Sequence, residues 1–311
     1  MAKLIIAIAT FIVSHFTFSQ EILSEDIDLK NGSIKLPGTL SYPKTDKAIP
    51  LAIFIHGSGN VDRNGNQSGI YNPGYIQQLA DSLNKKGIAF YRYDKRTATL
   101  ANLPTLMKGV NIKDFVEDAV LATNNFKDDH RFNSITLIGH SQGSLIAMLA
   151  AQECKVDKYI SVAGPAAKIE TTLERQLSQR NDSLSIILKA HFKELMETDT
   201  IAKVDPNLMS IFAPQNQKFF KSWNTYNPVE EIAKLKIPVL ILQGSSDLQV
   251  TEQDAQALHK QNTTSILKVI PKMNHPLKIV ENMQENQQSY SNPDFPLSSL
   301  LVSTISEFIK E

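Results

Sequence analysis

A serine lies between two glycines in the stretch Gly139-His140-Ser141-Gln142-Gly143. A Gly-x-Ser-x-Gly pattern is typical of a nucleophilic serine on a sharp turn between a buried strand and a helix, where the helix N–H groups face incoming negative charge. A side chain in place of either glycine would collide where the strand and helix backbones approach. Gly and Ser are common residues, so the pattern alone also fits an ordinary turn.

A serine hydroxyl is a weak nucleophile until a base takes its proton, so the chain must supply partners for Ser141. Asp247 and His275 each follow an apolar run that has the character of a buried strand. If these strands run parallel to the strand before Ser141, all three side chains emerge at one edge of the sheet. Asp247 could instead cap the helix expected from Thr251, His275 could be a core residue, and Asp94 is a rival acid.

From residue 50 onward, continuous apolar runs alternate with segments of helical periodicity. Strands are expected at residues 50–56, 88–94, 134–139, 158–164, 237–244 and 265–271, and helices at 76–86, 112–126, 145–152, 252–261 and 297–310. Before them, a hairpin with its turn at Asn31-Gly32 joins segments 21–29 and 33–42. The alternation predicts an α/β fold with a mostly parallel central sheet and helices on both faces.

The alternation stops between residues 165 and 228, where a charged helical pattern leads into an aromatic-rich stretch. We interpret this segment as a helical cap over the carboxyl edge of the sheet. Its aromatic cluster forms either the core of the cap or a wall of the substrate pocket, and Phe219 and Trp223 are the candidate substrate-binding residues. The segment 281–294 is expected to be a polar, mobile loop.

The first residues, MAKLIIAIATFIVSHFTFSQ, have a basic start, a short apolar core and small residues at its end, as in a secretory signal peptide. The alternatives are a buried first strand or a membrane anchor, although the run is shorter than the ~20 residues that a spanning helix needs. We expect export to the periplasm or the exterior, with cleavage near Ser19/Gln20 and no stable membrane anchor afterwards. The predicted division is 1–19 signal peptide, 20–164 and 229–311 hydrolase core, and 165–228 cap.

Composition narrows the range of partners. The 32 basic and 32 acidic residues balance, and no basic run is present, so a nucleic-acid partner is not expected. No group of His, Cys and Asp has the spacing of metal ligands, and there is no phosphate-binding or dinucleotide-binding loop, so we expect neither a metal nor a cofactor. The single Cys154 cannot form an internal disulfide. The oligomeric state is not predicted.

The order Ser, Asp, His, with these strand contexts, resembles the α/β-hydrolase fold over nearly all of the mature chain. The stretches HGSGNVDRNG, FYRYDKR and GHSQGS resemble the serine-aminopeptidase-like and dienelactone-hydrolase-like branch, which includes many esterases. This resemblance implies that Ser141 is the nucleophile, His275 the general base and then acid, and Asp247 the carboxylate that orients the imidazole. It further implies an oxyanion hole formed by the backbone N–H groups of Ser58 and Gln142.

Several nearby residues are expected to be structural. His56 is expected to hydrogen-bond the loop that follows it, and His140 to fill space beside the turn at Ser141. Four charged residues should pair with one another to brace the loops beneath the oxyanion hole: Asp62, Arg63, Asp94 and Arg96.

The sequence thus predicts an exported serine hydrolase that cleaves small-molecule carboxylic esters through an acyl-enzyme intermediate. A peptidase or amidase could use the same triad, and a non-catalytic binding module could keep the fold. An aminopeptidase needs an acidic group in the pocket to hold the substrate amine. The candidates are the cap residues Glu170, Glu174, Glu194 and Glu197, which the sequence does not place.

Overall fold

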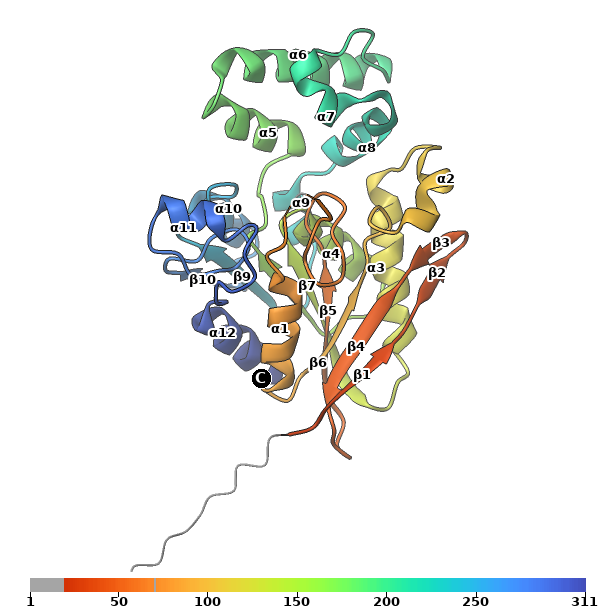
Figure 1. The fold of residues 1–311 in the computed structure, drawn as a ribbon, viewed down its shortest axis with the longest axis vertical. Coiled ribbons are helices and arrows are strands. Elements are labelled where there is room, and N and C mark those ends of the chain that lie inside the picture. The colour runs from red at the N-terminus through yellow and green to blue at the C-terminus, as the bar shows by residue number, and fades with distance from the viewer. Residues whose placement is uncertain (1–19, 70) are drawn as a thin grey trace, which may run out of the picture.

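The computed structural model describes residues 20–69 and 71–311, so the expected signal peptide lies outside the described residues. An eight-stranded sheet has the order β1-β4-β6-β5-β7-β8-β9-β10 (Figure 1). The strands from β6 to β10 are parallel to one another, whereas β4 pairs antiparallel with β6 and with β1. The predicted fold class, a mostly parallel α/β sheet with a helical insertion, is confirmed.

The elements lie close to the predicted ranges. The strands are β1 Ile22–Asp26, β2 Leu29–Asn31, β3 Ile34–Leu36, β4 Gly38–Pro43, β5 Ile49–Ile55, β6 Ala89–Tyr93, β7 Phe132–His140, β8 Lys158–Val162, β9 Val239–Gly244 and β10 Ile266–Ile270. The core helices are α1 Tyr75–Asn84, α2 Leu103–Leu106, α3 Ile112–Phe126, α4 Gln142–Glu153, α9 Pro228–Ile232, α10 Glu252–Gln261, α11 Met283–Gln288 and α12 Ser299–Lys310. Between β8 and β9 lie α5 Ile169–Ser178, α6 Asp182–Thr198, α7 Met209–Phe212 and α8 Pro214–Asn224.

Two hydrophobic cores cover the two faces of the sheet. Leu79 of α1 and Ile305 of α12 belong to one core, and these two helices pack side by side. Phe115 of α3, Ile146 of α4 and Leu258 of α10 belong to the other. The chain crosses from β5 to β6 on one side and then to β7 on the other, so the sheet reverses its order at β5. In open parallel sheets, ligands bind outside the carboxyl ends of the strands at such a reversal.

The hairpin expected at Asn31-Gly32 is present. Strands β2 and β3 pair antiparallel with Leu29 opposite Leu36, and Gly32 takes a φ of 59°, a left-handed conformation that favours glycine. Each expected strand is split in two, because β1 and β4 pair in the main sheet while β2 and β3 form a separate ribbon.

The expectation that 281–294 forms only a loop is wrong in part, because helix α11 occupies Met283–Gln288. The Asn282 side chain accepts a hydrogen bond from the Glu285 N–H at 2.9 Å and donates to the Glu285 carboxylate at 3.1 Å. The first bond satisfies a free N–H group of the helix, and such an N-cap can start a helix even in a polar segment. The Asn-x-x-Glu spacing at 282–285 could have predicted the start of this helix.

Helices α5 to α8 stand above the carboxyl ends of the parallel strands (Figure 1). They share an aromatic core in which the Phe192 and Phe212 rings lie 5.0 Å apart and the Phe212 and Phe220 rings 5.9 Å apart. The Phe219 ring contacts the Phe115 ring of α3 at 5.5 Å and so connects these helices to the core. The division of the chain into a cap and two core segments stays a prediction.

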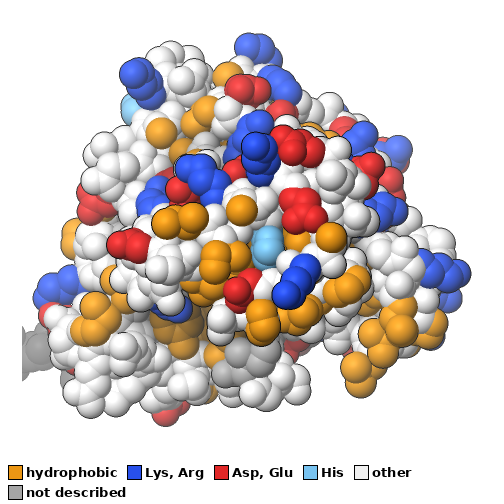
Figure 2. Space-filling view, turned by 90° about the horizontal axis from the view of Figure 1, so that it is seen from above, with side chains coloured by type: hydrophobic (Ala, Val, Ile, Leu, Met, Phe, Trp, Pro, Cys, Tyr) orange, Lys and Arg blue, Asp and Glu red, His pale blue; other side chains and the backbone are white. Residues whose placement is uncertain are grey.

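Seen from the side of helices α5 to α8, acidic and basic side chains alternate with hydrophobic ones (Figure 2). This mixture is consistent with the balanced charge of the sequence. No helix in the described part of the chain combines the length and the apolar character needed to cross a membrane.

A buried ion pair connects the loop after β6 to α3. The Arg96 guanidinium donates two hydrogen bonds of 2.7 Å to the Asp118 carboxylate, and both side chains are buried. Asn31 adds a third hydrogen bond to Asp118 at 3.0 Å. The expectation that Arg96 pairs with Asp62 or Asp94 is wrong, because the buried face of α3 offers a closer carboxylate. Burial raises the pKa of Asp118, although Arg96 and Asn31 act to lower it.

We expect Arg96→Met to lower the free energy of unfolding by about 3–5 kcal/mol, because it leaves a buried carboxylate without its counterion. Urea denaturation measures the change. The matched control is Arg131→Met, whose more exposed side chain pairs with Glu25 and Asp129, and whose loss should cost ~0–1 kcal/mol. Equal losses in the two variants would contradict the assignment.

Candidate active site

Ser141 is the single residue between the end of β7 and the start of α4. Its backbone has φ 55° and ψ −122°, a conformation that residues with a side chain rarely adopt. Such a residue costs ~1–3 kcal/mol and persists only where the surrounding structure enforces it. The Ser141 N–H donates to the Val162 carbonyl at 3.0 Å, which fixes the turn to β8.

The two glycines of the motif lie where backbones touch. A Cβ atom on Gly143 would lie 2.1 Å from the Ile55 carbonyl oxygen, and one on Gly139 would lie 2.4 Å from the Gly143 carbonyl oxygen. The collision expected from the sequence is therefore present at both positions. Gly57 is also close, since its Cβ would lie 3.2 Å from the Ser141 Cβ. The loop after β5 and the turn at Ser141 thus pack directly against each other.

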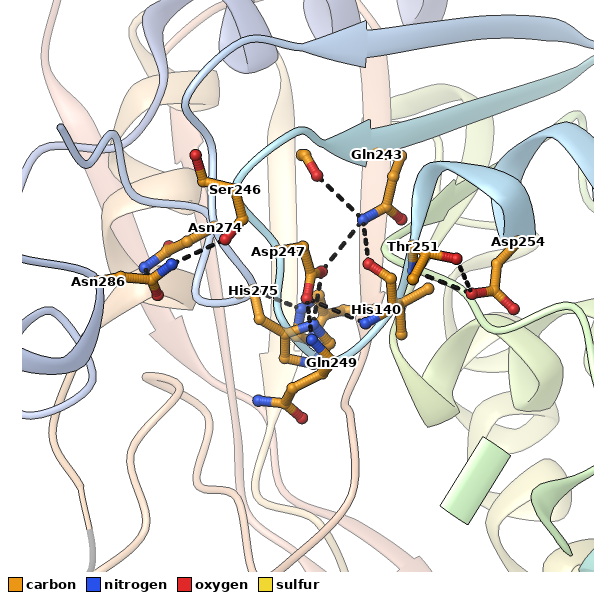
Figure 3. Close-up of polar contacts among 12 residues, drawn as sticks. His140, Gln243, Ser246, Asp247, Gln249, Thr251, Asp254, Asn274, His275 and Asn286 are labelled. Atoms are coloured by element: carbon orange, nitrogen blue, oxygen red, sulfur yellow. Dashed lines mark hydrogen bonds and ion pairs between the residues drawn. The ribbon is translucent and has the colours of Figure 1, made fainter. Parts of the chain in front are cut away.

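His275 and Asp247 form a hydrogen bond of 2.8 Å between Nδ1 and Oδ2 (Figure 3). Because an ionised carboxylate can only accept, Nδ1 of His275 carries the proton and Nε2 is left able to accept one. The N–H groups of Gln249 and Val250 donate to the other oxygen of Asp247 at 2.8 and 3.1 Å. Burial acts to raise the pKa of Asp247, but His275 and these N–H groups outweigh it and hold that pKa below its usual value.

The competing assignments have other partners in the structure. Arg63 binds the Asp94 carboxylate through Nε at 3.0 Å and Nη2 at 3.1 Å, as expected for a brace beneath the site. The N-cap of α10 is Thr251, and Asp254 completes its capping box. Asp247 therefore does not cap α10. It is also Asp247, and not Asp94, that bonds to His275.

A cavity of about 670 Å³ lies between the carboxyl edge of the sheet and helices α5 and α8. Six of the residues predicted for the site line it: Ser58, Ser141, Gln142, Phe219, Trp223 and His275. Asp247 lies behind His275 and does not reach the wall. Among the described residues of that wall, none is Asp or Glu. Nor does the described part of the chain contain three or more His, Cys, Asp or Glu side chains grouped to hold a metal ion.

The sequence did not indicate how His140 acts. Its Nε2 lies 2.9 Å from the His275 carbonyl oxygen, and the Tyr75 hydroxyl lies 3.3 Å from its Nδ1. Burial lowers the pKa of His140 to about 3, so the ring stays neutral. His140 therefore connects the turn beside Ser141 to the loop that carries His275.

A buried polar network holds the His275 loop from behind (Figure 3). Asn274 donates to the Asn286 side chain at 3.1 Å and to the Ser289 hydroxyl at 2.7 Å. Asn286 in turn donates to the Ser246 carbonyl at 2.8 Å, beside Asp247. The network joins the loops after β9 and β10 to α11. No short sequence pattern predicts it.

Lys95 was also missed. Its ammonium is buried and donates to the Gly57 carbonyl at 2.6 Å and to the Gln142 side-chain oxygen at 2.7 Å. Both partners belong to the segments predicted to form the oxyanion hole. The sequence signal for Lys95 was its place in the triplet Asp94-Lys95-Arg96, directly after a run with the character of a buried strand.

The fold and these residues place the chain in the α/β-hydrolase superfamily. Residues 70–279 match the family described as serine aminopeptidase, S33, and the chain belongs to this family. The chain is 29% identical over 232 residues to Esterase EstD of Thermotoga maritima, a match that covers 71% of this chain and 52% of that protein. The chain thus spans about half the length of this relative.

Two solved structures share the fold. Est1E from Butyrivibrio proteoclasticus has a TM-score of 0.57 at 20% identity, over 92% of this chain and 97% of that one. Dienelactone hydrolase from Anabaena variabilis has a TM-score of 0.54 at 17% identity, over 93% of this chain and 97% of that one. At these identities, both similarities establish a shared fold.

Proposed function

We propose that this protein is a serine hydrolase that cleaves carboxylic esters of small molecules through an acyl-enzyme intermediate. The observation that carries the proposal is that Ser141 and His275 line one cavity while Asp247 holds the imidazole of His275 from behind. Est1E and EstD support it, since one shares the fold and the other is named an esterase.

The proposed reaction uses the lone pair of His275 Nε2. This atom takes the proton of Ser141 as the serine oxygen attacks the ester carbonyl carbon, and the carbonyl oxygen becomes negatively charged. The backbone N–H groups of Ser58 and Gln142 donate to that oxygen. The bond to the alcohol oxygen then breaks, and the alcohol leaves with the proton from His275. Water repeats the sequence on the acyl-enzyme and releases the carboxylic acid.

The wall of the cavity supports an ester rather than an aminoacyl substrate. An aminopeptidase needs a carboxylate beside the free amine of its substrate, and the described wall contains none. Of the cap acids, Glu170 bonds to Asn224, Glu174 to Lys189 and Glu194 to the Ala202 N–H, and Glu197 is exposed. The wall instead contains the rings of Phe219, Phe220 and Trp223, and its polar residues include Gln67, Tyr71, Gln249 and Tyr290.

Export is a second part of the proposal, and its support is the pattern of the first residues. We expect mass spectrometry of the protein from its native compartment to show a mature start near Gln20, because Thr17-Phe18-Ser19 places small residues where signal peptidase reads. An uncleaved Met1 form in the cytoplasm would contradict export.

The triad is tested by three variants on aryl acetates. Ser141→Ala should abolish turnover and labelling by a fluorophosphonate, because it removes the attacking oxygen. Asp247→Asn should lower kcat by on the order of 10⁴, because the amide favours the wrong imidazole tautomer. Asp94→Asn is the matched control, since it changes the same group in the brace beneath the site and should cost far less.

A larger loss for Asp94→Asn than for Asp247→Asn, with both folded, would reverse the choice of acid. Faster cleavage of aminoacyl amides than of esters would identify a peptidase. If the wild-type protein neither hydrolyses esters nor reacts with the fluorophosphonate, it is a non-catalytic binding module on the same fold.

Phe219 and Trp223 should set the preference for acyl chain length. We expect Phe219→Ala and Trp223→Ala to change the ratio of kcat/KM between acetyl and longer acyl esters, since each methylene contact is worth ~1–3 kcal/mol in such a pocket. Phe212→Ala is the control, because this ring is fully buried within the cap and does not line the cavity. It should lower stability and leave the ratio unchanged; an unchanged ratio in all three variants would make these rings structural.

A further inference from the structure

Lys95 occupies a buried position between the two segments of the proposed oxyanion hole. It follows β6, and its ammonium reaches the loop after β5 and the first residue of α4. The ammonium also lies 5.0 Å from the centroid of the Phe115 ring, which closes it off on the side of α3. Among the described residues, no carboxylate forms an ion pair with it.

The contact with Gly57 fixes the direction of a neighbouring donor. The Gly57 carbonyl and the Ser58 N–H belong to one peptide unit, which is trans like all those described. In a planar trans peptide, C=O and N–H point in opposite directions. A lysine that holds the carbonyl therefore turns the Ser58 N–H away from itself. That N–H donates to no other described residue.

The second contact of Lys95 is with the side chain of Gln142, whose backbone N–H is the other proposed donor. The Gln142 side chain is buried, and its oxygen accepts the Lys95 ammonium at 2.7 Å. Gln142 begins α4, so its backbone N–H is among those without a partner in the helix. One ammonium thus contacts both the peptide unit that carries the Ser58 N–H and the side chain of Gln142.

We propose that Lys95 is a positioning residue that aims the Ser58 N–H at the oxyanion, holds the Gln142 side chain at the start of α4, and adds a positive charge beside both donors. The proposal rests on the ester hydrolysis proposed above. The hydrogen bond from Lys95 polarises the Gly57–Ser58 amide, so the Ser58 N–H becomes a better donor. The charge adds a direct attraction for the oxyanion, which is absent in the ester and present in the transition state.

The surroundings of Lys95 determine how its charge depends on pH. Burial lowers its pKa to about 7. The ionisable residues around it are His56, Tyr93 and Asp118 in a small cavity shared with it, Asp94 and Arg96 beside it in the chain, and Tyr75, His140 and His275 on the large cavity. Arg63 binds Asp94, and Arg96 binds Asp118, so both acids already have counterions. The ammonium is present below its pKa and is lost as the pH rises through it.

Lys95→Met tests the proposal, because it keeps the length of the side chain and removes the ammonium. We expect kcat on aryl acetates to fall tenfold to a hundredfold with KM little changed, less than the ~10²–10³ for loss of an oxyanion donor itself. The decline of wild-type kcat above neutral pH, its alkaline limb, should disappear in the variant. The free energy of unfolding should not fall, since a buried unpaired charge is removed.

Two further variants separate positioning from structure. Gln142→Met removes one acceptor of Lys95 and should cost less than Lys95→Met, and the double variant should resemble Lys95→Met, because the two act through one contact. Lys158→Met is the control: its ammonium also holds two carbonyl oxygens, those of Phe308 and Ile309, but at the other end of the sheet. It should leave kcat and the pH profile unchanged.

A Lys95→Met protein with the kcat and alkaline limb of the wild type would overturn the role of Lys95 and leave the esterase intact. A loss of kcat matched by a loss of stability, with the alkaline limb kept, would make Lys95 structural. If the wild type lacks both ester hydrolysis and fluorophosphonate labelling at Ser141, the proposed function fails, and this proposal fails with it.

Discussion

The contact between α4 and the end of β5 constrains every other part of the site. With a Cβ on Gly143 only 2.1 Å from the Ile55 oxygen, the helix backbone lies against the strand backbone. The chain must then turn from β7 into α4 within one residue, and Ser141 takes the strained conformation that this turn requires. The same contact brings the loop after β5 beside Ser141, so the proposed nucleophile lies next to the loop that carries the proposed Ser58 donor.

This arrangement could be predicted from the sequence, because it depends on short motifs and on the rule that parallel strands end at one edge of the sheet. Buried parallel strands end at one edge, so the residues that follow β7, β9 and β10 were expected together, and the glycines marked the close contact. Lys95 and Gln142 are 47 residues apart, and Ser246 and Asn286 are 40 apart, so no local pattern links them. Arg96 was assigned the wrong partner for the same reason: the sequence does not show which face of α3 meets the loop.

Buried ionisable groups are stabilised in different ways around the site. Asp118 has a guanidinium, and Asp247 has an imidazole and two backbone N–H groups. His56 and His140 stay neutral, since burial lowers the pKa of each to about 3. Lys95 is the only charged group among these whose partners are all neutral, which explains why burial acts so strongly on its pKa. An uncompensated cation is unfavourable in the resting protein and becomes favourable when a negative charge forms nearby.

The charges at the cavity also bear on the choice between substrates. The cap acids bond within the cap or lie in solvent, so the described wall offers a substrate ammonium no carboxylate. Lys95, on the same wall, would repel that ammonium at any pH at which it is itself charged. An ester brings no charge into the cavity and gains one only in the transition state, on the carbonyl oxygen. The arrangement proposed to stabilise an oxyanion would therefore disfavour a free amine, although the family is described as serine aminopeptidase.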